Sequence, residues 1–141
     1  MRIVLDTNVI IFGLLSKGPP GALFYAIQNG KYELCLTQQI LNEVKRVLHY
    51  PKILRRLKRA GVIPEEVLEW LLTNGKLFSD IEAVRVVAED PSDDVFINCA
   101  IASGAKWIVS GDIHLTKMGN YQGINIVSPA EFMRKSRKSD Y

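Results

Sequence analysis

The fold is decided at residues 1–8, which read Met1-Arg2-Ile3-Val4-Leu5-Asp6-Thr7-Asn8. Ile3, Val4 and Leu5 form a short apolar run with branched side chains, which predicts a strand buried on both faces of a parallel sheet. The run ends in Asp6, at the position where open α/β sheets bind their ligands. Aspartate is also a favoured N-cap residue. Asp6 is therefore either a site residue or the cap of a following helix.

Length and composition predict one globular domain. The chain has 141 residues, of which 48% are hydrophobic and 23% are charged, as in an ordinary soluble protein. No apolar stretch approaches the roughly 20 residues that cross a bilayer, and the N-terminus lacks the features of a signal peptide. We therefore expect a cytoplasmic protein without a membrane partner. Cys35 and Cys99 lie among apolar neighbours, which predicts buried, reduced thiols.

Further apolar runs alternate with helical patterns along the chain. Strands are predicted at residues 34–36, 84–87, 107–109 and 124–127. Helices or helical turns are predicted at residues 9–15, 22–28, 38–49, 64–74, 95–103, 113–118 and 129–133, with a break at residues 17–21. This alternation predicts an α/β three-layer sandwich with a central, mainly parallel sheet. The domain spans residues 1–133, and residues 134–141 form a basic, polar tail that we expect to be disordered.

Acidic residues stand at the ends of several predicted elements. Asp112 follows the strand at 107–109 as Asp6 follows the first strand, so parallel strands bring both acids to one edge of the sheet. Glu43 lies at the border of the apolar helix face, where an acid needs a partner. Asp90, Asp93 and Asp94 precede the helix at 95–103. One cap needs one side chain, so three acids within five residues repel one another unless a cation or a proton intervenes.

Clustered carboxylates predict a divalent metal site. Oxygen ligands select Mg²⁺ or Mn²⁺ over zinc, and such a site can catalyse in-line displacement at a phosphodiester. Other chemistries lack their motifs, because the chain has neither a Gly-rich phosphate loop nor a GxSxG sequence. His49 and His114 are isolated from metal-ligand and catalytic-triad spacings, which favours surface or cap roles for both.

Residues 45–59 carry seven basic side chains, and no acid lies between Glu43 and Glu65. Such a one-sided run indicates contact with the phosphate backbone of a nucleic acid, although a solvated surface is the usual alternative. The stretch has few aromatic residues, so base stacking is not predicted. The cations expected to contact the backbone are Lys45, Arg46, Lys52, Arg55 and Arg56.

Four motifs in order resemble a PIN domain over residues 1–133, most closely the VapC-like toxin ribonucleases of prokaryotic toxin–antitoxin pairs. The motifs are Ile3-Val4-Leu5-Asp6-Thr7-Asn8-Val9-Ile10, the helical Glu43, Asp90-Pro91-Ser92-Asp93-Asp94, and Trp107-Ile108-Val109-Ser110-Gly111-Asp112. The resemblance implies an endoribonuclease that depends on Mg²⁺ or Mn²⁺, forms homodimers, and has a small antitoxin protein as a partner. The implied catalytic acids are Asp6, Glu43, Asp94 or Asp93, and Asp112, with the metal on Asp6, Asp94 and Asp112. Thr7, Asn8 and Ser110 are the implied supporting polar groups.

Two points stay open at this level. Asp94 stands three residues before Ile97 and fits the commoner Asp-x-x-Ile spacing of the family, whereas Asp93 fits an Asp-Asn subgroup; Asp94 is slightly favoured. The same scaffold could also be a catalytically silent module that binds RNA or protein. A structure-specific DNA nuclease is the weaker alternative, because the chain lacks room for the extra helical arch that such enzymes use by resemblance.

Overall fold

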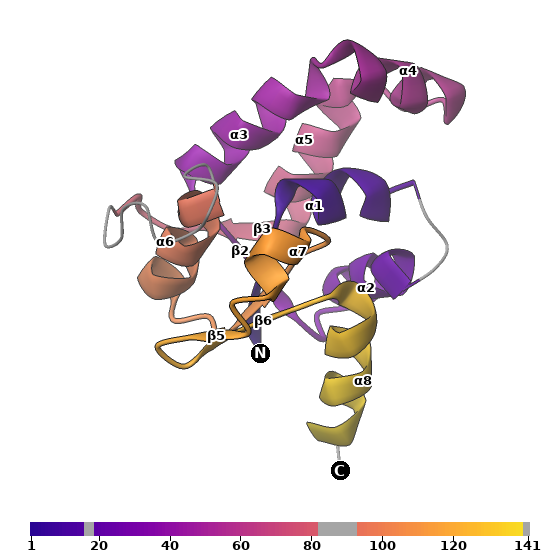
Figure 1. Cartoon of the computed structure of the whole chain (residues 1–141). Coiled ribbons are helices and arrows are strands. Elements are labelled where there is room, and N and C mark those ends of the chain that lie inside the picture. Colours follow the sequence, from indigo (N-terminus) through magenta and orange to yellow (C-terminus); the bar gives the residue numbers. More distant parts are fainter. Residues whose placement is uncertain (16–18, 82–92, 140–141) are drawn as a thin grey trace.

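The computed structural model describes residues 1–15, 19–81 and 93–139, and the side chains of residues 1–15, 21–81 and 93–136. These residues form a six-stranded sheet with helices around it (Figure 1). The strands are β1 (Arg2–Leu5), β2 (Glu33–Leu36), β3 (Gly75–Leu77), β4 (Trp107–Val109), β5 (Asn120–Tyr121) and β6 (Ile124–Val127). The helices are α1 (Thr7–Gly13), α2 (Pro19–Gln28), α3 (Gln38–Leu48), α4 (Pro51–Arg59), α5 (Pro64–Asn74), α6 (Asp94–Ser103), α7 (Ile113–Thr116) and α8 (Pro129–Ser139).

The strand order is β3-β2-β1-β4-β6-β5, with β1 and β4 at the centre. β5 pairs antiparallel to β6, and the other neighbouring strands are parallel. Both central strands are almost completely buried, as their continuous apolar sequences predict. The predicted α/β fold with a mainly parallel sheet is therefore confirmed.

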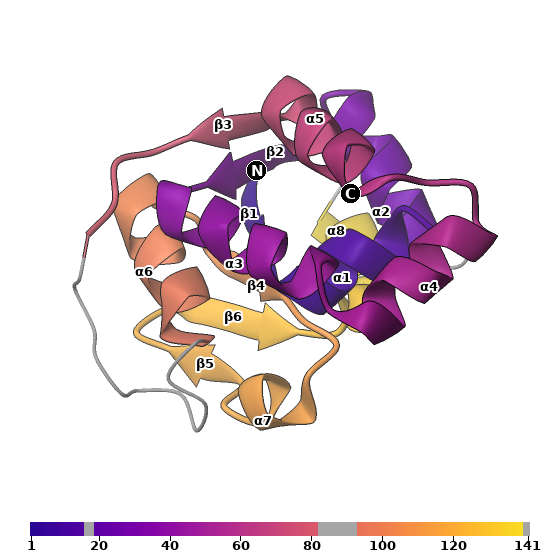
Figure 2. The same ribbon diagram turned by 90° about the horizontal axis from the view of Figure 1, so that it is seen from above.

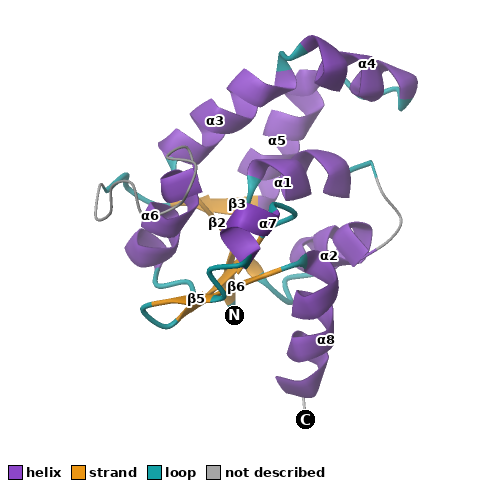
Figure 3. Ribbon diagram, in the orientation of Figure 1, coloured by secondary structure: helices purple, strands orange, loops and turns teal. Residues whose placement is uncertain are grey.

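Helices cover both faces of the sheet. α6 lies on one face, and α2 and α8 lie on the opposite face (Figure 2). α1 and α3 lie above the carboxyl ends of the strands, away from the N-terminus, as the view coloured by secondary structure also shows (Figure 3). The apolar stripe of α3 is buried through Ile40, Val44 and Leu48, which presents the opposite side of this helix to solvent. α1 and α3 therefore cover the carboxyl ends of the strands.

Three local predictions need correction or lie outside the described residues. The strand expected at 84–87 falls in a segment that the structure does not describe. Two strands were not predicted: β3, which directly follows α5, and the two-residue β5. α2 begins at Pro19, within the predicted break, because proline suits the first turn of a helix, where its missing N–H has no intrahelical partner.

The C-terminal segment is helical to Ser139, which corrects the predicted disorder for the part from residue 134 onward. Tertiary contacts explain the difference. Phe132 is completely buried between the rings of Tyr32 and Trp107, at centroid distances of 5.0 and 5.5 Å. One turn later Ser136 is also buried, and its Oγ accepts a 2.7 Å hydrogen bond from the hydroxyl of Tyr32. The basic composition of this segment did not predict that α8 packs against Tyr32 and Trp107.

Cys35 and Cys99 are buried free thiols, as predicted. Burial raises the pKa of both thiols, since a thiolate is poorly stabilised away from water. Within the described residues, no helix is long and apolar enough to span a membrane.

Candidate active site

The register of the central strands brings two acidic segments to one edge of the sheet. Leu5 pairs with Val109, and the backbone N–H of Asp6 donates a 3.0 Å hydrogen bond to the carbonyl of Val109. The chain therefore leaves β1 and β4 at the same level. Asp6 and Ser110 emerge side by side from strands that are more than 100 residues apart in the sequence.

Asp6 is held by hydrogen bonds to both carboxylate oxygens. Oδ1 accepts a 2.8 Å hydrogen bond from the backbone N–H of Val9, so Asp6 is the N-cap of α1. Oδ2 accepts from the hydroxyl of Ser110 and, at 3.2 Å, from the N–H of Gly111. Burial nevertheless raises the pKa of Asp6 above its ordinary value, and the negative charge of Asp112 adds to the increase. The N-cap interpretation of Asp6 is therefore confirmed, and its role as a site residue stays a prediction.

Asp112 is oriented by the same serine. Ser110 is completely buried, and its Oγ accepts a 2.9 Å hydrogen bond from the N–H of Asp112 while donating to Asp6. The carboxylate of Asp112 accepts a 2.9 Å hydrogen bond from the N–H of His114, which makes it the N-cap of α7. One hydroxyl thus connects the two acids that follow the central strands.

A cavity of about 320 Å³ opens above this edge, between α1, α3 and the start of α6. Four acidic residues from four separate segments line it: Asp6, Glu43, Asp93 and Asp112. The other lining residues are Thr7, Asn8, Arg46, Val47, Tyr50, Ile53 and Phe96. Sequence positions from 6 to 112 therefore converge on one cavity.

Glu43 enters the cavity from α3 in an ion pair with Arg46 of the same helix. Its Oε1 lies 2.6 Å from Nη2 of Arg46, and its Oε2 accepts from Nε at 3.2 Å. The Glu43 side chain is 16% exposed and that of Arg46 is 53% exposed. Arg46 also donates from Nη1 to the hydroxyl of Tyr50, and its guanidinium lies 5.5 Å from the centre of the Tyr50 ring. Glu43, at the border of the apolar face of α3, is therefore paired with Arg46, three residues later in the same helix.

The two neighbouring aspartates at the start of α6 are placed differently. Asp93 precedes the helix and lines the cavity. Asp94 is the first helical residue, is 6% exposed, and is not among the residues that line the cavity. The geometry thus places Asp93 next to the other acids, whereas the sequence slightly favoured Asp94. Asp90, the third acid of this motif, lies outside the described residues.

The chemistry of the cavity fits a hard divalent cation. Its potential ligands are carboxylate and hydroxyl oxygens, which Mg²⁺ and Mn²⁺ prefer. The Oγ1 of Thr7 is buried beside these acids and has no hydrogen-bond partner among the described residues, which is unusual for a buried hydroxyl. Within the same part of the chain, no three acidic, histidine or cysteine side chains already converge on one point.

The predicted backbone-binding cations divide into two groups. Arg46 lines the cavity, as described above. The others lie outside it on exposed faces: Lys45 on α3, and Lys52, Arg55 and Arg56 on α4. The guanidinium of Arg56 lies 4.5 Å from the centre of the Phe12 ring, so this cation also packs on α1. The basic run borders the acidic cavity on the side of α4.

Sequence reasoning missed the apolar and aromatic lining of the cavity, namely Val47, Tyr50, Ile53 and Phe96. One signal could have identified Tyr50. It follows Glu43 by seven residues and Arg46 by four, which is the spacing of side chains on one helical face. The two apolar positions on α3 and α4 have no such signal, because residues of this kind usually pack in a core.

The family model of the PIN domain matches residues 2–114 of the chain. The chain belongs to the PIN domain family. The match includes both central strands, the helix that carries Glu43, and the segment with Asp93 and Asp112. All four acids that line the cavity therefore lie within the residues that the family model matches.

A solved structure has the same fold as this PIN domain. It is a chain from the crystal structure of VapBC2 from Rickettsia felis bound to a DNA fragment from their promoter. The two chains superpose with a TM-score of 0.58 at 13% sequence identity, over 89% of this chain and 97% of the other. At this identity the likeness is one of fold. None of the curated proteins matches the chain.

Proposed function

We propose that this PIN domain is a Mg²⁺- or Mn²⁺-dependent endoribonuclease that hydrolyses RNA phosphodiester bonds. The observation that supports the proposal most is the cavity at the sheet edge, where acids from four segments meet: Asp6, Glu43, Asp93 and Asp112. Membership of the family supports the same reaction class, because PIN domains are typically nucleases. The basic surface beside the cavity suits a polyanionic substrate.

In this proposal, Asp6, Asp93 and Asp112 would hold the cation. Asp93 is assigned the ligand role at the start of α6 in place of Asp94 because Asp93 lines the cavity. A bound divalent cation would lower the pKa of a water and stabilise the leaving oxygen of an in-line displacement. Ser110 donates to the carboxylate of Asp6 and accepts from the backbone N–H of Asp112, so it fixes the position of both residues at the site.

The remaining polar groups would bind the substrate. Thr7 and Asn8 line the cavity beside Asp6 and can donate hydrogen bonds to a phosphate oxygen or to the attacking water. The exposed cations of α3 and α4 lie outside the acids, where they would hold the flanking backbone without reading its sequence. The cations outside the cavity are Lys45, Lys52, Arg55 and Arg56, and Arg46 would contact the backbone from the cavity itself.

The biological role that we propose is that of a toxin in a toxin–antitoxin pair. The likeness to a chain of the VapBC2 structure supports this role. The partner would be a small antitoxin protein, and the chain would act as a homodimer on RNA in the cytoplasm. Purification of the chain together with the product of a neighbouring small gene would test the partner directly.

The substitution Asp6→Asn tests the catalytic proposal. It keeps an oxygen that can cap α1 but removes the negative charge from the cavity, so RNA cleavage should fall by at least about 100-fold. Cleavage of single-stranded RNA should also stop in EDTA and return with Mn²⁺. Circular dichroism and thermal unfolding should show that the variant remains folded.

Glu65→Gln is the matched control, because it removes an exposed acid of α5 that does not line the cavity. Its cleavage rate should equal that of the wild type. Undiminished cleavage by Asp6→Asn, or by the wild type in EDTA, would contradict the proposal. RNA binding without cleavage in any divalent metal would favour a silent binding module, and faster cleavage of flapped DNA would favour a DNA nuclease.

A further inference from the structure

Glu43 differs from Asp6 and Asp112, which also line the cavity, in its partner. Asp6 and Asp112 accept hydrogen bonds from neutral groups, whereas both oxygens of Glu43 are bound by the guanidinium of Arg46. Paired hydrogen bonds between a carboxylate and a guanidinium are among the stronger contacts of a protein surface. The carboxylate of Glu43 is therefore already paired with a cation of the protein itself, with N···O distances of 2.6 and 3.2 Å.

This pair creates a competition inside the proposed metal site. Each oxygen of Glu43 accepts one hydrogen bond from Arg46 and keeps a second lone pair, so the competition with a metal is one of charge: the guanidinium disfavours a second cation beside the same carboxylate. Arg46 and Glu43 both line the cavity, so the competition takes place within the proposed site. Release of Arg46 would therefore strengthen the attraction of Glu43 for a metal.

Tyr50 determines where Arg46 would go after release. Its hydroxyl accepts a hydrogen bond from Nη1 of Arg46, and its ring lies beneath the guanidinium at 5.5 Å from the centroid. Tyr50 also lines the cavity. A guanidinium that leaves Glu43 is thus retained at the cavity wall, where an anionic phosphate would be its next partner.

We infer that Arg46 couples metal binding to RNA binding by exchanging partners with Glu43. Without metal, Glu43 holds Arg46 and keeps it from the substrate. With metal, Glu43 would turn from Arg46 to the divalent cation that Asp6, Asp93 and Asp112 would hold, and the guanidinium, retained by Tyr50, would become available to the phosphodiester. The inference rests on the proposed function and assigns Arg46 a coupling role that the other basic residues of α3 and α4 do not share.

A double-mutant cycle with Mn²⁺ tests the first half of the exchange. Calorimetric titration would be carried out on wild type, Arg46→Met, Glu43→Gln and the double variant. Arg46→Met should bind Mn²⁺ about threefold more tightly than wild type, the size expected when an ion pair of this exposure is removed. In the Glu43→Gln background the same substitution should leave Mn²⁺ affinity nearly unchanged. A general effect of one fewer positive charge would instead persist in both backgrounds.

The same four proteins test the second half with RNA in EDTA, where no cleavage competes. The probe is a short fluorescein-labelled single-stranded RNA, followed by anisotropy. Glu43→Gln should tighten RNA binding about threefold because it frees Arg46, and the gain should disappear when Arg46 is also methionine.

Lys106→Met is the control for lost charge, since Lys106 is exposed at the start of β4, at the opposite edge of the sheet. It should change neither affinity. Equal effects of Arg46→Met in both backgrounds, or weaker Mn²⁺ binding by Arg46→Met, would overturn the inference, the latter by showing that Arg46 only positions Glu43. Absence of Mn²⁺ binding by the wild type, or tight binding by Asp6→Asn, would instead contradict the proposed function.

Discussion

At the scale of single residues, one serine organises the acids of the cavity. Ser110 is completely buried, donates to Asp6, and accepts from the N–H of Asp112. Hydrogen bonding to a carboxylate stabilises its charged form, which partly offsets the effect of burial on the pKa of Asp6. The serine therefore contributes both to stability and to the geometry of the proposed site.

Ser110→Ala should separate these two contributions. Loss of the hydroxyl leaves the N–H of Asp112 without its acceptor, so the free energy of unfolding should fall by about 1–3 kcal/mol. Cleavage should fall by about 10- to 100-fold, as for other groups that orient a metal ligand. Urea unfolding and the rate of RNA cleavage are the two measurements.

Ser103 provides a matched control for this substitution. It is also a buried serine, whose Oγ donates to the carbonyl of Ala100 and accepts from the N–H of Ala105, but it does not line the cavity. Ser103→Ala should lower stability to a similar extent and leave the cleavage rate unchanged. Equal losses of activity in both variants would show that the effect of Ser110 arises from stability alone.

At the scale of elements, α4 carries the exposed cations that we propose contact the substrate, beside the cavity that holds the acids. The helix buries Ile53 and Leu57 and exposes a row of cations, among them Lys52 and Arg55. Of these residues only Ile53 reaches the cavity. The helix is thus suited to hold the backbone of a nucleic acid beside the acids without touching the reacting phosphate.

Lys52→Met and Arg55→Met should each weaken RNA binding without affecting catalysis. If each side chain contacts one phosphate, the slope of log K against log salt should decrease by about 0.7 per substitution. The cleavage rate at saturating RNA should remain that of the wild type. Salt titrations of RNA binding provide the measurement, and an unchanged slope in both variants would exclude α4 from the RNA path.

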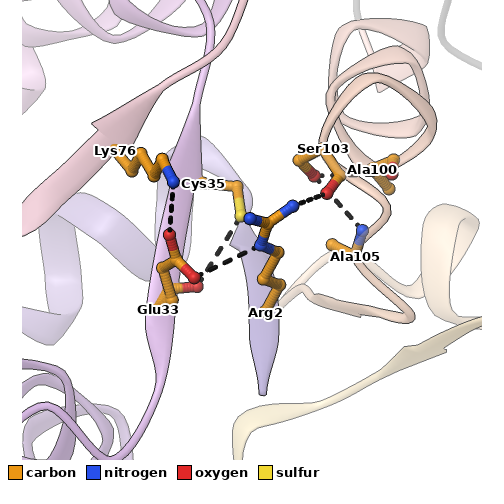
Figure 4. Close-up of polar contacts among 7 residues, drawn as sticks. All are labelled: Arg2, Glu33, Cys35, Lys76, Ala100, Ser103 and Ala105. Atoms are coloured by element: carbon orange, nitrogen blue, oxygen red, sulfur yellow. Dashed lines mark hydrogen bonds and ion pairs between the residues drawn. The ribbon is translucent and has the colours of Figure 1, made fainter.

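At the scale of the whole molecule, the two edges of the sheet have opposite electrostatic character. The carboxyl edge gathers acids, whereas at the amino edge Arg2, Glu33 and Lys76 form ion pairs of opposite charge (Figure 4). Glu33 on β2 lies 3.2 Å from Arg2 on β1 and 3.5 Å from Lys76 on β3, and Arg2 also donates to the carbonyl of Ser103 at 2.5 Å. Hydrogen bonding from Arg2, helped by the charge of Lys76, lowers the pKa of Glu33. The amino edge thus joins three strands and α6.

Glu33→Gln should therefore change the pH dependence of stability. Since the pKa of Glu33 is lower in the folded than in the unfolded chain, its charge stabilises the fold above the unfolded pKa, and this stabilisation is lost as the pH falls through the folded pKa. The variant should be less stable than wild type at neutral pH, and the difference should vanish in acid. Urea unfolding across this pH range measures it, and a difference that is independent of pH would contradict the assignment.

Local sequence patterns were sufficient for much of the fold and for most of the site. Ile3 to Leu5 predicted a buried central strand, and the acid that follows each central strand predicted the edge where Asp6 and Asp112 meet. These inferences succeeded because a strand run and the acid that follows it are neighbours in the chain, and parallel strands have their carboxyl ends at the same edge. Whether Asp93 or Asp94 lines the cavity, by contrast, depends on how α6 packs against the sheet.

Contacts between distant segments decided the remainder. α8 continues past Met133 because Ser136 meets Tyr32, more than 100 residues away. β3 forms because Gly75–Leu77 pair with β2, and no residue within this short segment predicts the pairing. Glu43, Arg46 and Tyr50 likewise line one acidic cavity only because of tertiary packing. A sequence pattern determines which side chains share a face of one element, but the packing of several elements determines which cavity that face lines.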